Sequence, residues 1–187
     1  MPLVSSGEIS IGGSTTNRSI NLELGRSATA TSSLNESALR TLAGVSSGQI
    51  SLSSFYGKSN ASVAISDQTA YNYSLVGIGG TATATYRLHS NGQAYRTDFG
   101  GTLVSINGEW RVSGDTSLFD AYATWSGSGG TVGGTTGSWV NLGTTRDWTL
   151  TATNTYASRT LSLQIRLASS GSTLDTATIT FEVDSAP

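Results

Sequence analysis

Cysteine is absent from this 187-residue chain, histidine occurs once, and only 12% of the residues are charged. Without cysteine, no disulfide bond holds the fold and no thiolate is available for catalysis. A single histidine, His89, leaves almost nothing for a multi-histidine metal site or a histidine-based triad. Its place beside a turn predicts an ordinary surface residue. We therefore expect no enzymatic activity, no metal and no cofactor.

Basic clusters and long hydrophobic runs are missing as well. The chain has ten Lys and Arg residues and twelve Asp and Glu residues, which gives a net charge of −2. The basic residues are scattered and form no block. A nucleic-acid partner is therefore not expected. No apolar run approaches the roughly 20 residues of a membrane-spanning helix, so we expect no membrane insertion. The N-terminus also lacks the basic and apolar regions of a signal peptide, which predicts synthesis and retention in a cytoplasm.

Apolar and polar residues alternate with a period of two through most of the chain after residue 60. The clearest segments are "TATATYRLH" (81–89), "DWTLTAT" (147–153), "LSLQIRL" (161–167) and "DTATITFEV" (175–183). Strict alternation indicates sheets with one wet face and one dry face, and two such sheets must cover each other. We predict a mainly β fold, an immunoglobulin-like antiparallel β-sandwich of roughly seven to nine strands, over residues 60–187.

Glycine marks the expected turns. Asn91-Gly92 and Asn107-Gly108 each stand between two strand-like segments, which predicts two hairpins with type I′ turns. The stretch "SGSGGTVGGTTGS", residues 126–138, offers little to pack, so we expect a mobile surface loop. It is either a long hairpin connection or a partner-binding loop.

The first 59 residues differ from this pattern and are expected to form an N-terminal arm. Ser33 and Glu36 fit the capping box S-x-x-E, Leu39 and Leu42 follow at helical spacing, and Gly44 stands where a helix would end. A helix this short is marginal alone, so it needs a surface to cover. Short strands, or in the last case a turn, are expected in "GEISIGG" (7–13), "SINLELG" (19–25) and "QISLSSFYG" (49–57).

Two kinds of side chain remain as candidates for a site. Paired carboxylates serve glycosidases at a defined separation that a sequence does not reveal, and scattered acids on turns are ordinary. These acids are Asp98, Glu109, Asp115, Asp120 and Asp147. Trp125 and Trp148 are in phase with core residues. Trp139 follows the glycine-rich stretch and, with Tyr122, is a candidate contact for a glycan ring.

One segment carries a resemblance to a known family. Residues 20–59 contain the pattern N-x-E-L-G, S-L-N, R-x-L-A-G-V, S-G-x-I-S and F-Y-G-K. This pattern resembles a segment that recurs in structural proteins of tailed bacteriophages, where it often opens a tail or fibre protein. The runs W-x-x-L…R-x-W-x-L (139–150) and L-x-I-R…L-x-x-A-x-I (163–179) are more loosely similar to small β-sandwich modules of phage tails.

The resemblance implies a non-enzymatic virion component of the tail, baseplate or a fibre, made in the host cytoplasm. The arm would dock on other virion proteins through short strands and apolar anchors. Its expected contact residues are Leu34, Leu39, Arg40, Leu42, Phe55, Tyr56 and Lys58. A homo-oligomer within a symmetric assembly is expected. The alternatives are a capsid decoration protein, or a host-recognition module that binds a surface glycan through Trp139 and Tyr122.

Overall fold

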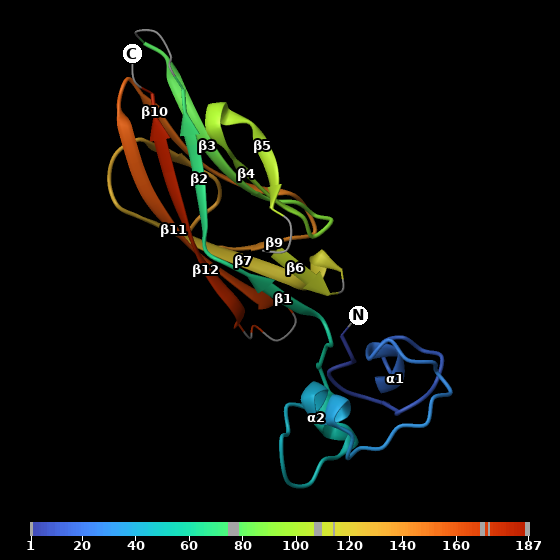
Figure 1. Cartoon of the computed structure of the whole chain (residues 1–187). Helices are drawn as coiled ribbons and strands as arrows, with labels where there is room; N and C mark the ends of the chain where they lie inside the picture. The colour runs from blue at the N-terminus through green and yellow to red at the C-terminus, as the bar shows by residue number, and fades with distance from the viewer. Residues whose placement is uncertain are drawn as a thin grey trace. The chain divides into compact units, whose positions relative to one another are not determined.

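The computed structural model of the protein describes residues 2–74, 79–106, 110–113, 115–168, 171 and 173–185. The chain divides into two compact units, Met1–Ala61 and Ser62–Pro187, which Figure 1 shows in one view. We call them the N-terminal unit and the sandwich unit. The expected boundary at residue 59 lies two residues before the division between them.

The sandwich unit consists mainly of strands. They are β1 (Ser62–Ile65), β2 (Gln68–Tyr73), β3 (Thr81–Leu88), β4 (Ala94–Thr97), β5 (Leu103–Ile106), β6 (Trp110–Ser113), β7 (Phe119–Ser126), β8 (Thr131–Gly133), β9 (Trp139–Asn141), β10 (Arg146–Thr153), β11 (Tyr156–Leu167) and β12 (Thr173–Asp184). Two short 3-10 helices, η2 (Phe99–Gly101) and η3 (Thr116–Leu118), join some of them.

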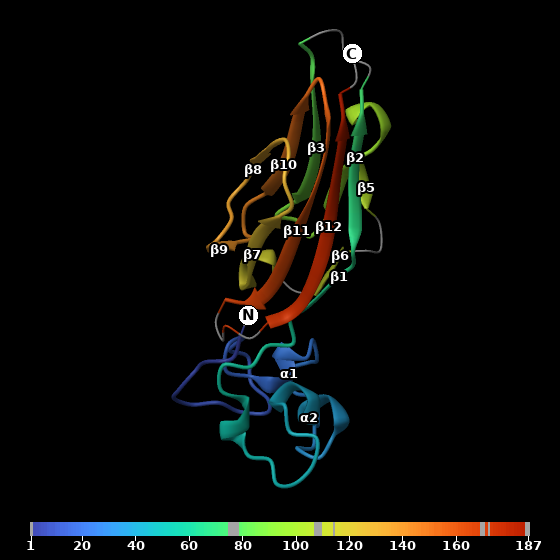
Figure 2. The ribbon, with the colours of Figure 1, turned by 90° about the vertical axis from the view of Figure 1, so that its left-hand side faces the viewer.

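Two five-stranded sheets form the sandwich among the described residues, which confirms the predicted fold class. One sheet has the order β5-β4-β3-β10-β8, and the other has the order β2-β12-β11-β7-β9. Figure 2 shows β11, β12 and β2 of the second sheet side by side. A separate ribbon pairs β1 with β6. Ladder pairs are antiparallel except for β2, which runs parallel to β12 along one edge.

The period of two in the sequence sets the core of the sandwich. In the pairing of β3 with β10, Trp148 lies opposite Tyr86 and Leu150 lies opposite Ala84, and all four are fully buried. The alternating threonines take the outer face, where the hydroxyl oxygens of Thr83 and Thr151 are 2.8 Å apart. Each large apolar side chain buried in this way stabilises the fold by about 1.5–3 kcal/mol.

Of the two predicted Asn-Gly hairpins, one is confirmed and one is wrong. β3 and β4 pair across Asn91-Gly92, but only Gly92 has a positive φ (82°), and its N–H donates to the His89 carbonyl. That is a type I turn followed by a left-handed glycine rather than a type I′ turn. β5 and β6 do not pair, because β5 pairs with β4 and β6 with β1. The Asn107-Gly108 turn lies outside the described residues.

The glycine-rich stretch is not the free surface loop that its composition predicts. Its residues Thr131–Gly133 form β8, which pairs with β10 of the first sheet, while β7 before it and β9 after it belong to the second sheet. A Cβ atom on Gly134 would lie 2.8 Å from Cδ1 of Trp148, and one on Gly130 would lie 2.8 Å from Cδ1 of Leu150. These glycines therefore let the backbone pass closely over the buried side chains of β10.

The N-terminal unit has two short α-helices, α1 (Ile20–Glu23) and α2 (Ser37–Ala43), and a 3-10 helix, η1 (Leu52–Phe55). The expected strands are wrong in the described residues of this unit, which contain only an isolated bridge between Ser10 and Ser19. Segment 19–25 forms a helix instead, because the Ser19 hydroxyl accepts the Leu22 N–H and caps it.

Helix α2 begins later than the capping box predicts. Glu36 is its N-cap residue, and the Glu36 carboxylate accepts the Ser33 N–H at 3.2 Å, while the Ser33 hydroxyl accepts the Asn35 N–H at 3.3 Å. The Glu36 half of the capping box is therefore formed, but the Ser33 hydroxyl does not accept the Glu36 N–H, which donates to the Ser33 carbonyl in a turn before the helix. The predicted end is confirmed. Gly44 is left-handed (φ 73°), and the Val45 N–H donates to the Arg40 carbonyl.

The close passage over Trp148 gives a first prediction. Gly134→Ala should lower the free energy of unfolding by about 2–4 kcal/mol, because the new methyl group overlaps β10 and the residue has a positive φ of 96°. Gly137→Ala is the matched control, since its φ is 74° but no atom lies within 4 Å, and it should cost about 1 kcal/mol. Urea denaturation of both variants measures the difference, and equal losses would contradict the close approach.

Candidate functional site

Three of the seven residues expected to contact a partner belong to the core of the N-terminal unit. Leu39 and Phe55 are fully buried and Leu42 is 7% exposed. They cluster with Leu3, Ile9, Ile20 and Ala43. The apolar face of α2 thus covers its own unit, so these three side chains are not available as anchors for a partner.

The other four residues keep part of their surface exposed. Leu34 is half-buried at the edge of the core, and the Tyr56 hydroxyl donates to the Gly7 carbonyl. Arg40 spans the end of α2, because its guanidinium donates to Asn35 Oδ1 at 3.0 Å, to the Val45 carbonyl at 3.3 Å and to the Gly48 carbonyl at 3.0 Å. Its role in the unit is therefore structural as well.

The first motif of the resembling segment, N-x-E-L-G, connects loops within the N-terminal unit. Asn21 is fully buried, donates to the Ala30 carbonyl at 2.7 Å and accepts the Ser32 hydroxyl at 2.7 Å. Glu23 Oε1 accepts the Ser59 hydroxyl at 2.9 Å and the Asn60 N–H at 2.8 Å. Glu23 thereby holds the segment through which the chain leaves the unit.

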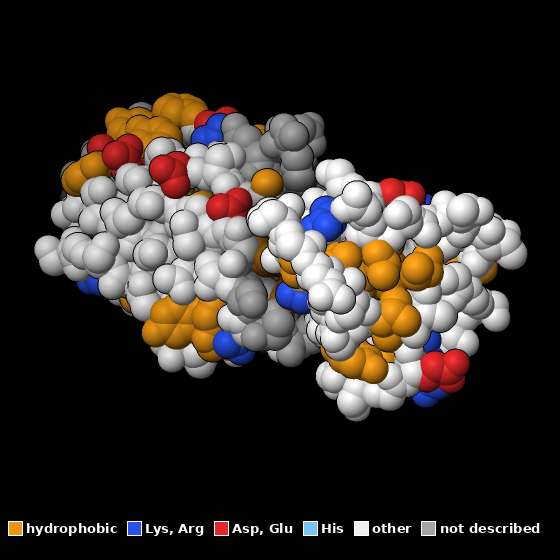
Figure 3. Space-filling model, turned by 90° about the horizontal axis from the view of Figure 1, so that it is seen from below, with side chains coloured by type: hydrophobic (Ala, Val, Ile, Leu, Met, Phe, Trp, Pro, Cys, Tyr) orange, Lys and Arg blue, Asp and Glu red, His pale blue; other side chains and the backbone are white. Residues whose placement is uncertain are grey.

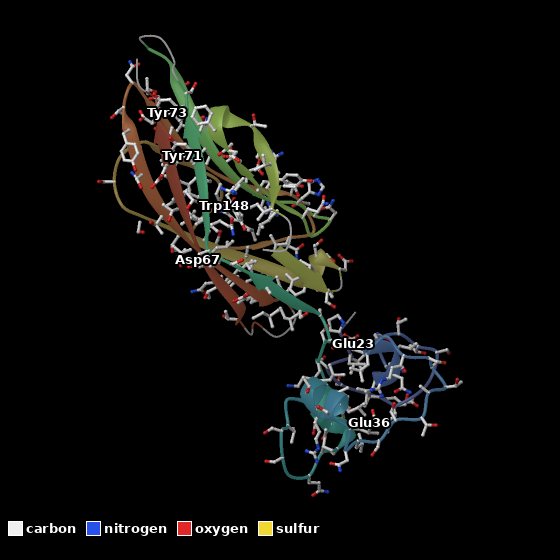
Figure 4. All side chains as sticks on the ribbon, viewed as in Figure 1. Glu23, Glu36, Asp67, Tyr71, Tyr73 and Trp148 are labelled. Atoms are coloured by element: carbon white, nitrogen blue, oxygen red, sulfur yellow. The ribbon has the colours of Figure 1, made fainter. Side chains whose placement is uncertain are left out.

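An ion pair ties the loop after α1 to the start of α2. The Arg26 guanidinium lies 2.6 Å from the Glu36 carboxylate and also donates to the Ser32 hydroxyl at 2.8 Å. The hydrogen bond from Arg26, and after it the one from the Ser33 N–H, lower the pKa of Glu36 below its ordinary value. Figure 4 marks Glu36 together with Glu23 in this unit.

A groove of about 540 Å³ opens beside the C-terminal end of α2. Its lining residues are Asn35, Ser37, Arg40, Thr41, Gly44, Val45 and Ser46, and none is acidic. Lys58 Nζ would lie 3.4 Å from a Cβ atom on Gly44, so a second cation stands at this groove. Lys58 has no ion pair with a described residue. We call this feature the α2 groove. The resemblance pointed to Arg40 and Lys58 but not to Thr41 or Ser46, which no motif singles out.

Hydrophobic side chains also reach the surface of this unit. Figure 3 shows a group of them on the face of the N-terminal unit turned toward the viewer. Leu52 in η1 is 38% exposed, and several apolar side chains lie half-buried against the core. These are Ile11, Leu24, Leu34, Val45, Ile50 and Tyr56. The unit therefore combines an apolar surface with a cationic groove.

The candidate glycan contacts form a different arrangement from the flat platform that stacking on a sugar requires. The rings of Tyr122 and Trp139 are 5.3 Å apart but tilted by 41°, and both side chains are half-buried. The Arg166 guanidinium lies 3.9 Å from the Trp139 ring centroid and pairs with Asp120 at 3.3 Å. Because Arg166 covers one face of Trp139, the ring packs within the protein.

The acids and the histidine considered above have local structural contacts where the structure describes them. Asp120 and Asp147 pair with arginines, and Asp98 and Asp115 accept backbone N–H groups at the starts of η2 and η3. Glu109 lies outside the described residues. His89 Nδ1 accepts the Asn91 N–H at 3.3 Å in the β3–β4 turn. No hydrogen bond or ion pair joins two of these groups on the described part of the chain.

Within the described ranges, no group of three or more His, Cys, Asp and Glu side chains is placed to hold a metal ion. The helices described there are all too short or too polar to cross a membrane. In comparisons with known proteins, no family model matches the chain, and no curated protein matches it.

The core of the N-terminal unit gives a second prediction. Leu39→Ala should cost about 2–5 kcal/mol, which is comparable to the whole stability of a unit this small. Amide hydrogen exchange on the full chain should therefore show loss of protection in residues 2–61, with the sandwich unit unchanged. Leu52→Ala, at an exposed position, should change the stability by less than about 0.5 kcal/mol. Equal loss of protection in both units would contradict separate cores.

The Arg26–Glu36 pair gives a third prediction. A lowered pKa in the folded protein means that the pair stabilises the unit above the ordinary pKa of Glu, and that this contribution is lost as the pH falls through the lowered value. Arg26→Gln should raise the pKa of Glu36 toward the ordinary value of a glutamate, because the largest cause of its lowering is removed. Carboxyl NMR titration measures it. Arg18→Gln is the control and should leave Glu36 unchanged. A Glu36 pKa that does not respond to Arg26→Gln would contradict the pairing.

Proposed function

We propose that the protein is a non-enzymatic structural component of a tailed-phage virion, carried on the tail, the baseplate or a fibre, and attached through its N-terminal unit. One observation carries the proposal. The segment that resembles phage structural proteins, residues 20–59, lies entirely within a compact unit that has its own hydrophobic core. A unit that folds around its own core, here with Leu3 and Ile9 from before the segment, can be joined to different bodies, as expected of an attachment module.

The α2 groove and the apolar surface around it are the proposed attachment site. The N-terminal unit carries four basic and three acidic side chains. Two of the acids pair with Arg18 and Arg26, and Glu23 accepts hydrogen bonds from the exit segment. Arg40 and Lys58 are left to attract a negatively charged surface of another virion protein, with Leu52 as an apolar contact. Repeated attachment around a symmetric particle would bring several copies together.

Two alternatives differ in location and in partner. A capsid decoration protein would use the same attachment unit at another place on the particle. A module that recognises host glycans through Trp139 and Tyr122 is less well supported, because Arg166 covers the Trp139 ring.

A substitution in the α2 groove tests the attachment. Thr41→Glu places a negative charge at an exposed position in the groove lining, where it opposes the attraction of an acidic surface, and Thr16→Glu makes the same change at an exposed position outside that lining. We expect Thr41→Glu to lower the copy number in purified particles about tenfold, equivalent to ~1.4 kcal/mol of attachment free energy. Thr16→Glu should leave it unchanged. Quantitative mass spectrometry of the particles gives the copy number, and cryo-electron microscopy gives the location.

Two results would contradict the proposal. Absence of the unaltered chain from purified particles would exclude a virion component. Equal incorporation of both variants would exclude the α2 groove as the attachment site.

A further inference from the structure

The outer face of the second sheet brings side chains of β2 together with side chains of the consecutive strands β11 and β12, which are distant from β2 in the sequence. The antiparallel register places Tyr156 of β11 opposite Asp184 of β12, and the parallel register places Tyr73 of β2 opposite the same residue. Two residues earlier on each strand, and therefore on the same face of the sheet, Tyr71 lies opposite Glu182. Strand residues directly opposite each other have Cβ atoms about 5 Å apart, so these side chains form two adjoining rows.

Aromatic rings surround the two carboxylates. Tyr156 is 57% exposed, and Phe99 of η2 is 68% exposed and stacks on Tyr73 at 5.7 Å and 23°. Figure 4 shows Tyr71 and Tyr73 following each other along β2, with Asp67 toward its start. We call the set the acidic aromatic patch, made of Tyr71, Tyr73, Phe99, Tyr156, Glu182 and Asp184.

The two carboxylates of this patch differ from the other described acids of the sandwich unit. The side chains of Asp67, Asp98, Asp115, Asp120, Asp147 and Asp175 each accept a hydrogen bond or pair with an arginine. No contact within the described part of the chain engages the carboxylates of Glu182 and Asp184. Two residues apart on one strand, they stand about 7 Å from each other and repel.

A groove of about 350 Å³ continues from the patch along β2 and β12. Thr69 and Thr180, the next opposed pair after Tyr71 and Glu182, belong to its lining. The two charged residues of the groove lining, Arg96 and Asp67, have opposite signs; Arg96 donates to the Thr69 carbonyl at 2.9 Å and the Asp67 carboxylate accepts the Thr178 N–H. The lining therefore has no net charge, and the excess negative charge beside it lies within the patch.

We propose that the acidic aromatic patch binds an arginine or lysine side chain of an extended segment of a partner protein, which continues along this groove. A cation relieves the repulsion between the two carboxylates and gains cation–π attraction from the surrounding rings. A neutral sugar would leave that repulsion in place. The patch lies on the sandwich unit, so this contact is separate from attachment through the N-terminal unit.

Two synthetic peptides and the full chain test the proposal. The probes are Gly-Ser-Arg-Gly-Arg-Gly-Ser and the same peptide with glutamine in place of arginine, added to 15N-labelled protein and followed by NMR. The arginine peptide should shift the amide signals of β2, β11 and β12, and the glutamine peptide should not. Asp184→Asn should weaken binding about fivefold, the effect of losing one charge contact at the protein surface. Glu8→Gln removes the same charge from the N-terminal unit and should leave binding unchanged.

Salt and competing ligands complete the design. Raising the salt concentration from about 20 to about 500 mM should weaken the binding of the arginine peptide to the protein, because salt screens the attraction between exposed charges. Equal binding of both peptides, or binding unaffected by Asp184→Asn, would overturn the proposal. Shifts of the same signals by neutral oligosaccharides, with none from the arginine peptide, would assign the patch to glycans instead. Self-association of the chain that Asp184→Asn abolishes would assign it to a second copy.

Discussion

The burial of Trp148 is the interaction on which the sandwich depends most. Its indole is 1% exposed, lies opposite Tyr86, and donates its N–H to the Thr135 carbonyl at 3.0 Å. The backbone at Gly134 closes over this ring, and a side chain there would overlap it. The same passage forms β8 on the first sheet and returns the chain to β9 on the second, which places Trp139 beside Tyr122 and under Arg166. The packing of the backbone over the Trp148 ring thus accompanies both the passage of the chain from one sheet to the other and the position of Trp139 after it.

The N-terminal unit is held together by polar contacts between its loops as well as by a small apolar core. A unit of about 60 residues buries a smaller share of its surface than a larger domain does, so its apolar core leaves it only marginally stable. Long loops connect its short helices, and polar side chains fix those loops to one another. Asn21, Glu23 and Arg40, all in the resembling segment, each bind two or more backbone or side-chain groups across loops. These motif residues of the chain therefore hold the loops of the unit together.

Charge divides the surface of the protein into compensated and uncompensated regions. Arg26, Arg87 and Arg166 each pair with a nearby carboxylate, which makes these charges part of the fold. At the α2 groove and at the acidic aromatic patch, charges of one sign lie without an ion pair to a described residue of opposite sign. Uncompensated charge of this kind steers association and selects partners more than it stabilises a monomer. The two surfaces have opposite sign and lie on separate units, which suits them to different partners.

Local patterns in the sequence are sufficient for the features that depend on neighbouring residues. The alternation in β3, β10, β11 and β12 predicts both the strands and their buried rows, because the side-chain direction reverses at every residue. Gly44 marks the end of α2 for a similar reason, since only a residue tolerant of positive φ ends a helix in this way. The resemblance also drew attention to Arg40 and Lys58, which stand together at one groove.

The tertiary structure alone decided which segments meet. The parallel pairing of β2 with β12, the pairing of β6 with β1 and the passage of Gly134 over Trp148 depend on contacts between residues far apart in the chain. The sequence pattern of α2 indicated an apolar face. Only the folded unit showed that Leu39 of this face and Phe55 of η1 are buried in the same core. Glu182 and Asp184 become a shared patch with Tyr73 and Tyr156 through strand registers, which no local spacing contains.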